Sequence, residues 1–310
     1  MLARVAENLY WIGRNIERCE HCSRYLKVQF FSTLDVPMSN SKDFILRSIL
    51  FMSGSSFSMD IDLKEEEVWK KVIFDYDNPN SIVSIARNTR ENARSIRNSI
   101  STELWESINK WFLYTKDLKA DRFSSSDIFS FTEAINTHIA LIRSNVHNTL
   151  LQNDTWNFIC LGIYTERSIQ VLRILRSKIS DSSILSNNGA NAPLREYQWV
   201  TLLRSLEAVD MYKIQNKGEF SEEGVLKLIL DNDIFPRSIP FATTRALSYF
   251  SRIYIYSAGD KEILKKTANR LIKISKAKDF SDIDQTMTNI TDTQNCIYDF
   301  HNELEKLYFQ

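Results

Sequence analysis

The sequence predicts an all-α protein, a helical bundle of about ten helices built from two internally duplicated halves. Three observations indicate this fold. Glycine and proline number only 7 and 5 in 310 residues, well below the roughly 7% and 5% of average usage, so few residues are available for hairpin turns. Apolar residues recur at three- and four-residue steps, which is typical of amphipathic helices. Blocks of sequence also repeat between the two halves of the chain.

Composition bounds the class of protein. Apolar residues make up 43% of the chain and charged residues 25%, enough to bury a large core. Lys and Arg total 39, as do Asp and Glu, so the chain lacks the net positive charge with which general nucleic-acid binders find phosphate. The first seven residues include charged side chains where a signal peptide needs an apolar run, and no apolar run reaches the length of a membrane helix. We therefore expect a cytoplasmic protein with no nucleic-acid or membrane partner.

The cysteines are too few for a disulfide framework in a chain of this length. They are Cys19, Cys22, Cys160 and Cys296. Cys19 and Cys22, with His21 between them, have the spacing of half a zinc site or a redox pair, but no second pair completes a tetrahedral site. The favoured interpretation is that Cys19 packs as a small apolar residue, and we expect no metal and no cofactor.

One long amphipathic helix is predicted from about residue 2 to residue 31, where apolar side chains recur from Val5 to Phe30. Polar and proline-containing clusters separate the other helical segments. Among these gaps is the serine- and asparagine-rich stretch 177–193.

Three blocks of the first half recur in the same order in the second half. The motif Gly13-x3-Glu17-Arg18 returns as Gly162-x3-Glu166-Arg167, at an offset of 149 residues. Two further blocks, beginning at Leu46 and Pro79, return at Leu203 and Pro236 with an offset of 157. We therefore predict two helical halves of common origin, 1–150 and 151–310, packed as one compact unit and related by a pseudo-twofold axis.

The repeated motif places Gly13 and Glu17 on one stripe of the first helix, and Gly162 and Glu166 on the corresponding stripe of its counterpart. Glycine within a helix is usually compensated by the close approach of another backbone. A carboxylate beside such a contact is partly buried and needs a partner. We predict that the two stripes face each other or a shared neighbour, and that both glutamates pair with arginines from other helices. Two interpretations stay open: an ion-pair lattice that fixes the packing, or a ligand or partner site.

Four arginines form a second group, at spacings of three, four and three residues on a helix that begins near Pro79 and is capped by Asn78 or Ser81. They are Arg87, Arg90, Arg94 and Arg97, with Glu91 and Asn92 among them. Like charges on one stripe need acids or an anion opposite, and the guanidinium group binds carboxylate or phosphate through two parallel hydrogen bonds. Internal acids are the favoured partners, and an external carboxylate, phosphate or acidic peptide is the alternative. The internal candidates are Glu17, Glu20, Glu103 and Glu166.

Known catalytic motifs are absent from the sequence: there is no nucleophile elbow, Walker loop, zinc-protease motif or dinucleotide-binding loop. His138 and His147, nine residues apart, do not share a helix face as metal ligands. Most tryptophans and tyrosines are expected in the core. Only Glu17 or Glu166 could titrate usefully within the Glu and Arg groups.

Several motifs together resemble the alpha-E domain family, bacterial helical proteins named for an ER motif. They are Met1-Leu2-x-Arg4-Val5-Ala6-Glu7-Asn8-Leu9-Tyr10-Trp11-Ile12-Gly13-Arg14 with Glu17-Arg18, Ala86-Arg87-x3-Glu91-Asn92-Ala93-Arg94-x2-Arg97, Glu103-x-Trp105-Glu106, Gly162-x3-Glu166-Arg167, Tyr197-Gln198-Trp199 and Phe235-Pro236-Arg237-Ser238-Ile239. The chain departs from the family pattern at Cys19 to Arg24, and the segment 116–153 matches only loosely.

The resemblance implies a partner of circularly permuted ATP-grasp-type ligases or of transglutaminase-like peptidases, in a pathway that makes or trims amide-linked peptides. The first hypothesis is a non-catalytic helical subunit that binds such a ligase, or its peptide substrate or product, through the Glu and Arg groups. The alternative is an enzyme of peptide formation or processing with a buried Glu as base and arginines holding a carboxylate or phosphate. The residues to test are Glu17, Arg18, Arg87, Arg90, Asn92, Arg94, Arg97, Glu166 and Arg167.

Overall fold

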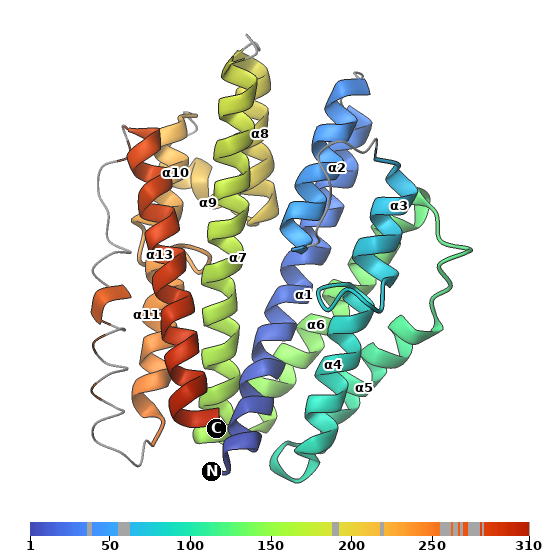
Figure 1. Cartoon of the computed structure of the whole chain (residues 1–310), viewed down its shortest axis with the longest axis vertical. Coiled ribbons are helices and arrows are strands. Elements are labelled where there is room, and N and C mark those ends of the chain that lie inside the picture. Colours follow the sequence, from blue (N-terminus) through green and yellow to red (C-terminus); the bar gives the residue numbers. More distant parts are fainter. Residues whose placement is uncertain are drawn as a thin grey trace. The chain divides into compact units, whose positions relative to one another are not determined.

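The computed structural model describes residues 1–35, 39–54, 63–187, 192–217, 220–254, 262, 266, 269–271, 280 and 282–309. Every regular element in these ranges is a helix, and they contain no strand, so the predicted all-α class is confirmed (Figure 1). The internal duplication stays a prediction.

The chain divides into two compact units. Asn15–Trp156 form the first, which we call the N-terminal unit, and Met1–Arg14 together with Asn157–Gln310 form the second, the C-terminal unit. Residues 1–14 therefore belong to the same compact unit as the second half of the sequence. The predicted halves, 1–150 and 151–310, their common origin and their packing as one compact unit stay predictions.

Two long helices contribute residues to both units: α1 (Ala3–Asp35) and α7 (Asp154–Asn187). Helix α1 confirms the long amphipathic helix expected from residue 2 to residue 31. The gap expected at 177–193 is wrong over its first part, because α7 continues to Asn187. Tertiary packing overrides the weak helix propensity of this serine-rich stretch. Ile179 is 1% exposed, and the buried Lys178 Nζ lies 3.0 Å from Asp181 Oδ2, one turn further along α7.

The N-terminal unit contains α2 (Ser39–Ser53), α3 (Glu65–Trp69), a π-helical turn (Lys70–Phe74), α4 (Ile82–Ser95), α5 (Thr102–Asp117) and α6 (Ile128–Thr149). Helix α5 packs against both α4 and α6. The core of the N-terminal unit includes Trp69 and Trp111, which are fully buried. On α1, Ser23 Oγ donates to the Thr132 carbonyl of α6, and Tyr25 hydrogen-bonds with Ser48 of α2.

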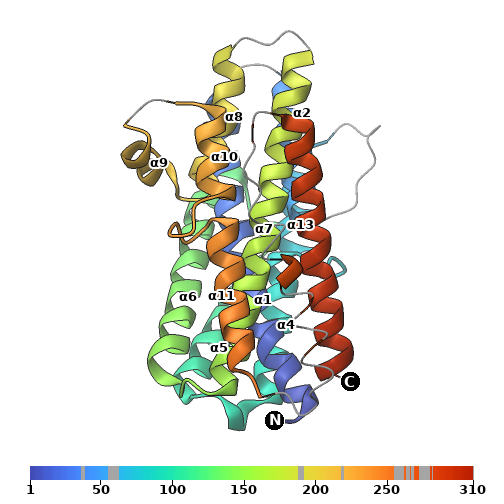
Figure 2. The same ribbon diagram turned by 90° about the vertical axis from the view of Figure 1, so that its left-hand side faces the viewer.

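The C-terminal unit contains α8 (Ala192–Ser205), α9 (Val209–Gln215), α10 (Glu222–Leu230), α11 (Ile239–Arg252), α13 (Ile283–Leu304) and a final π-helical turn (Glu305–Phe309). Helices α7, α11 and α13 run alongside one another (Figure 2). Tyr164 of α7 stacks on Tyr249 of α11 with ring centroids 5.6 Å apart. Phe250 of α11 meets Phe300 of α13 edge to face at 5.3 Å.

Helices α4 and α11 begin in the same way, although they lie in different units. Each has 14 residues and a serine N-cap, and Ser81 and Ser238 accept hydrogen bonds from the backbone N–H groups of Ser84 and Phe241. These caps satisfy backbone donors that have no partner within the helix. The predicted cap at Ser81 is therefore confirmed.

None of the helices in the described part of the chain is long and apolar enough to span a lipid bilayer.

Candidate functional site

Gly13 and Gly162 lie where α1 and α7 approach each other within the C-terminal unit. A Cβ atom on Gly13 would come within 3.0 Å of the Ile159 carbonyl oxygen, and one on Gly162 within 3.0 Å of the Tyr10 carbonyl oxygen. The contact is reciprocal, because each glycine lies against the carbonyl group of the residue three positions before the other glycine. The sequence prediction that a second backbone compensates each helical glycine is confirmed.

Glu166 is fully buried beside this contact and accepts hydrogen bonds from Arg14 and Gln170. Arg14 Nε donates to Glu166 Oε2, and Gln170 Nε2 donates to Oε1 at 2.7 Å. Arg14 is itself only 4% exposed. Its Nη1 lies 3.2 Å from the Tyr10 hydroxyl, which is 3.3 Å from His301 Nδ1 on α13. The buried carboxylate is therefore neutralised inside the C-terminal unit.

Burial and charge act in opposite directions on the groups around Glu166. Burial has the largest single effect on Arg14 and lowers its pKa, but the charge of Glu166, the nearby Tyr10 and the hydrogen bonds to both together raise that pKa above its ordinary value. Burial also raises the pKa of Tyr10, and the charge of Arg14 only partly offsets this. At neutral pH Arg14 is a cation and Tyr10 a neutral hydroxyl.

Glu17, the counterpart of Glu166, is also fully buried, within the N-terminal unit. Arg143 of α6 binds both Glu17 and Glu20, the latter at 2.5 Å. Arg24 Nη1 then pairs with the other oxygen of Glu20 at 2.9 Å, and His21 Nε2 lies 3.3 Å from Glu17 Oε1. Two carboxylates thus face two guanidinium groups in a charge-balanced cluster. Burial lowers the pKa of Arg143, and the charges of Glu17 and Glu20 raise it above its ordinary value.

The arginine of each ER pair makes an equivalent contact in its own unit. Arg18 Nη1 donates to Asn80 Oδ1 at 3.0 Å, in the turn that precedes α4. Arg167 Nη1 donates to the Pro236 carbonyl at 3.1 Å, in the turn that precedes α11. Each glutamate therefore pairs with a guanidinium group, while each arginine contacts the turn before a serine-capped helix.

The pairing of both glutamates with arginines from other helices matches the sequence prediction. Each glutamate is paired within its own unit, Glu17 with Arg143 and Glu166 with Arg14. The glycines of the two predicted stripes face each other, whereas each glutamate finds its arginine within its own unit. Sequence reasoning gave no role to Arg143, which lies in the loosely matched segment 116–153, and the residue carries no signal that distinguishes it from other helical arginines.

The predicted arginine stripe is real on α4, but its partners differ from those expected. Glu91 of the same helix pairs with Arg90 Nη1 and Arg94 Nη2, both at 2.7 Å. The prediction that Glu17, Glu20, Glu103 and Glu166 pair with these arginines is wrong for the described residues, where the contacts are local. Glu91 and Arg94, three residues apart, meet on one helix face without any loop closure, and Arg90 pairs with its neighbour in sequence, Glu91.

Aromatic rings lie beneath three of these arginines. Arg87 is 5.2 Å from the Tyr76 ring centroid, Arg90 is 4.8 Å from that of Phe112, and Arg97 is 5.4 Å from that of Trp105. Such stacking holds guanidinium planes while leaving donor groups available. We call Arg87, Arg90, Arg94 and Arg97 the arginine face. The side chain of Arg94 is 64% exposed.

Two details of the arginine face correct the sequence prediction. Arg97 lies beyond the end of α4, in a short 3₁₀ turn (Arg97–Ser99), because Ile96 has left the helical conformation. It therefore does not share the stripe of the other three. Asn92 is half-buried and makes no side-chain hydrogen bond within the described residues, so no role is assigned to it.

The hydrogen bond from Arg94 lowers the pKa of Glu91 below the ordinary value of a glutamate, and Arg90 adds to this effect. Glu91 is therefore a carboxylate over the whole neutral range, and it reduces but does not cancel the positive charge of the arginine face.

The thiols of Cys19 and Cys22 lie in the core rather than at a surface site. Burial raises the pKa of Cys19 well above its ordinary value, and the nearby Cys22 adds to the shift. A thiol with these properties is inert at neutral pH and packs as a small apolar residue. Among the described residues no group of three or more His, Cys, Asp and Glu side chains is placed to hold a metal ion.

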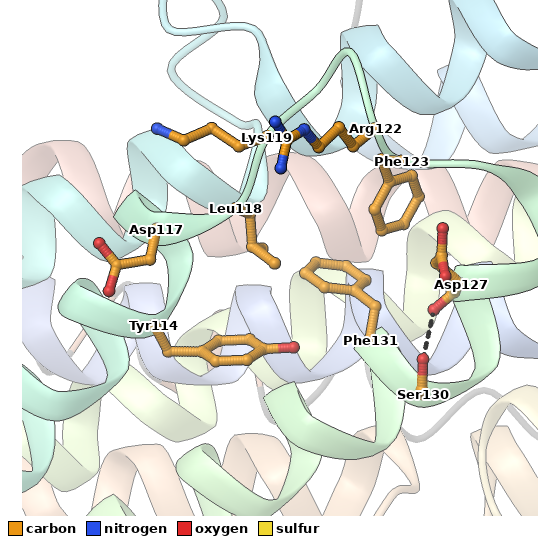
Figure 3. A pocket seen from close by; sticks show the side chains of 9 residues that line it. All are labelled: Tyr114, Asp117, Leu118, Lys119, Arg122, Phe123, Asp127, Ser130 and Phe131. Carbon is orange, nitrogen blue, oxygen red and sulfur yellow. Dashed lines mark hydrogen bonds between the residues drawn. The ribbon is translucent and has the colours of Figure 1, made fainter.

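A pocket of about 330 Å³ opens in the N-terminal unit, where the loop after α5 leads into α6 (Figure 3). Its lining includes aromatic rings, two cations and two acids, namely Tyr114, Asp117, Leu118, Lys119, Arg122, Phe123, Asp127, Ser130 and Phe131. Sequence reasoning missed it, because loop 118–127 has no motif and brings these side chains together only through its path. Neither ER glutamate lines this pocket.

One family of known proteins matches almost the whole chain. The family model Alpha-E, described as a predicted alpha-helical domain with a conserved ER motif, matches residues 1–309. No curated protein and no solved structure matches the chain. Two pairs carry the letters of the motif, Glu17-Arg18 and Glu166-Arg167, and each has the contacts described above. This chain belongs to the Alpha-E family.

Proposed function

We propose that this chain is a non-catalytic helical subunit that binds a protein or peptide partner through charged side chains. The observation that carries the proposal is the state of the two ER glutamates. Glu17 and Glu166 are each 0% exposed and each is neutralised by a guanidinium group. A general base must reach the proton it abstracts, directly or through one water. These two carboxylates support the packing of helices rather than contact with a substrate.

The arginine face is the proposed binding surface. Helix α4 carries three exposed or half-exposed arginines on this surface and one carboxylate, Glu91, which pairs with two of them. The surface therefore keeps a local positive charge, although the chain has no net charge. Stacking on Tyr76 and Phe112 restricts Arg87 and Arg90, which lowers the entropy lost when they bind an anion. Carboxylates or phosphates on the partner complement such a surface.

For the partner we propose a circularly permuted ATP-grasp-type ligase, or the peptide that it makes, as the family resemblance implies. A transglutaminase-like peptidase of the same pathway is the alternative partner. The proposed setting is the bacterial cytoplasm, in a pathway that forms amide-linked peptides.

Binding to the purified ligase tests this proposal. The variant Arg87→Ala/Arg94→Ala removes two exposed charges without touching the buried clusters, and we expect at least about tenfold weaker binding by biolayer interferometry. Raising the salt concentration should weaken wild-type binding in the same direction. Arg245→Ala is the matched control, because Arg245 is also exposed and stacks on Phe241 at 5.2 Å, but on α11. Equal binding by the wild type and the double variant would remove the arginine face from the interface.

The enzyme hypothesis keeps one supporting observation. Arg143 is 20% exposed and Glu20 is 14% exposed, so the outer edge of the Glu17 cluster reaches solvent. If the cluster were catalytic, Glu20→Gln and Glu17→Gln would abolish peptide formation in a reconstituted ligase mixture at unchanged ligase binding. The subunit proposal predicts that any loss of product follows the loss of folded protein.

A further inference from the structure

The pocket beside loop 118–127 has a preformed aromatic floor. Phe131 is 2% exposed and meets Phe123 edge to face, with ring centroids 5.6 Å apart. Phe74 also meets Phe123 edge to face at 5.1 Å, and Tyr114 lies against His138 at 5.1 Å. These contacts fix the rings in place without a ligand. Ligand pockets are commonly concave sites of roughly 300–1,000 Å³ with such linings, so about 330 Å³ suits one small molecule.

Charged groups of both signs line the mouth above this floor (Figure 3). Lys119 and Arg122 are exposed, and within the described residues neither side chain forms an ion pair or hydrogen bond. The same holds for the exposed carboxylate of Asp117. In Figure 3, Asp117 lies near Tyr114 at one end of the pocket, and Arg122 lies over Leu118 and toward Phe123.

The second acid of the lining is already engaged. Asp127 Oδ2 accepts hydrogen bonds from the Ser124 backbone N–H at 2.8 Å and from the Ser124 hydroxyl at 2.9 Å. The first of these bonds belongs to a capping box at the start of the short helix that leads into α6. It is also the main reason why the pKa of Asp127 is lowered. Asp117 is therefore the carboxylate that remains available to a ligand.

A ligand with a single charge would leave part of this mouth uncompensated. An anion satisfies Lys119 and Arg122 but is repelled by Asp117, whereas a cation meets the opposite arrangement. A molecule with a carboxylate, an ammonium group and an apolar body matches all three parts of the lining. The aromatic floor favours a flat apolar body, because offset and edge-to-face ring contacts are favourable there.

We propose that this pocket binds a free amino acid with an aromatic side chain, its carboxylate at Arg122 and Lys119, its ammonium group at Asp117 and its ring against Phe131 and Tyr114. The proposal concerns a second site, apart from the arginine face, and it does not depend on the ligase partner. It gives the loosely matched segment 116–153 a function of its own.

Isothermal titration of the full chain with L-phenylalanine tests the proposal, and three probes each lack one feature. These probes are 3-phenylpropionate without the amine, phenethylamine without the carboxylate, and glycine without the ring. We expect saturable binding of L-phenylalanine with a Kd at or below about 10 mM, and at least about fivefold weaker binding of each probe. Failure of L-phenylalanine to bind in this range, or equal binding of any probe, would overturn the proposal.

Substitutions at two exposed positions test which side chain binds the carboxylate of the ligand and which binds its ammonium group. Arg122→Gln should weaken the binding of L-phenylalanine about fivefold without weakening that of phenethylamine. Asp117→Asn should also weaken the binding of L-phenylalanine, without weakening that of 3-phenylpropionate. Lys110→Gln, on the exposed side of α5 and outside the lining, is the matched control. All three positions are exposed, so the variants should fold, and circular dichroism checks this. Wild-type affinity in both pocket variants would contradict the proposed site.

Discussion

At the scale of single residues, Gly13 and Gly162 are required because two helix backbones touch there. Each Gly→Ala substitution would place a Cβ atom within 3.0 Å of a carbonyl oxygen on the other helix. Alanine raises helix propensity by about 1 kcal/mol, but forced overpacking costs typically 1–3 kcal/mol or more. We expect Gly13→Ala and Gly162→Ala each to lose about 2 kcal/mol of unfolding free energy in urea titrations.

The control for this prediction is Lys110→Ala, at an exposed helical position, which should change stability by no more than about 0.5 kcal/mol. Glycine variants as stable as this control would mean that the two helices separate without cost at this contact.

Glu91 gives a prediction about pH at the same scale. Its folded-state pKa is lowered, first by the hydrogen bond from Arg94, so its stabilising effect is complete above pH 4.5, the ordinary value, and is lost as the pH falls through the folded-state value. A ¹³C NMR titration of the side-chain carboxyl should give a midpoint below 4.5. Arg94→Ala should return the midpoint toward 4.5, and an unchanged midpoint in this variant would assign the shift to another group.

Residue patterns predicted some of these contacts and not others. A glycine inside a helix, followed one turn later by a glutamate, indicated both a close backbone and a buried, paired carboxylate. The identity of the partner could not be predicted, because Arg143 is separated from Glu17 by most of the N-terminal unit and the fold alone brings them together. The pairing of Arg94 with Glu91, three residues apart, was predictable from helical spacing, whereas that of Arg90 with the adjacent Glu91 was not. Repulsion among the arginines suggested more distant acids.

At the scale of elements, the starts of α4 and α11 share one design. A serine caps each helix, and an ER arginine contacts the turn before it. Loss of a serine N-cap costs about 1 kcal/mol. We therefore expect Ser81→Ala and Ser238→Ala each to lose about 1 kcal/mol in urea titrations.

Ser99→Ala is the control for the two caps, since Ser99 is exposed and lies beyond the end of α4, in the 3₁₀ turn that follows it. If only one of the two cap variants were destabilised relative to this control, the two helix starts would differ energetically despite their similar geometry.

Element boundaries were predictable where proline and capping residues mark them, as at Pro79 and Ser81. They were not predictable at 177–187, where serine, lysine and aspartate favour a loop by composition. Burial of Ile179 and pairing of Lys178 with Asp181 continue α7 there. The pocket is a property of this same scale, since loop 118–127 and the ends of two helices create it together.

At the scale of the whole molecule, the all-α class followed from composition and periodicity, whereas the division into units did not. Met1–Arg14 group with Asn157–Gln310 because the glycine contact and the Arg14–Glu166 pair join the start of α1 to α7. The sequence order of the helices does not carry this information. The equivalent contacts of Arg18 and Arg167 support the predicted duplication, which stays a prediction.

The central claim is that the ER glutamates are structural charges on which global stability depends. Removing one partner of a buried ion pair leaves an uncompensated charge and costs about 3–5 kcal/mol, whereas apolar replacement of both partners costs far less. The variants Glu166→Gln, Arg14→Met and the combined Arg14→Met/Glu166→Leu should therefore differ, and Glu106→Gln, at an exposed position of α5, is the control.

The most direct measurement is the unfolding free energy of these variants by urea titration, with the wild type beside them. We expect a loss of about 3 kcal/mol for each single variant, a smaller loss for the double variant than the sum of the two, and little change for Glu106→Gln. Wild-type stability of Glu166→Gln would show that the buried ion pair does not hold the fold together.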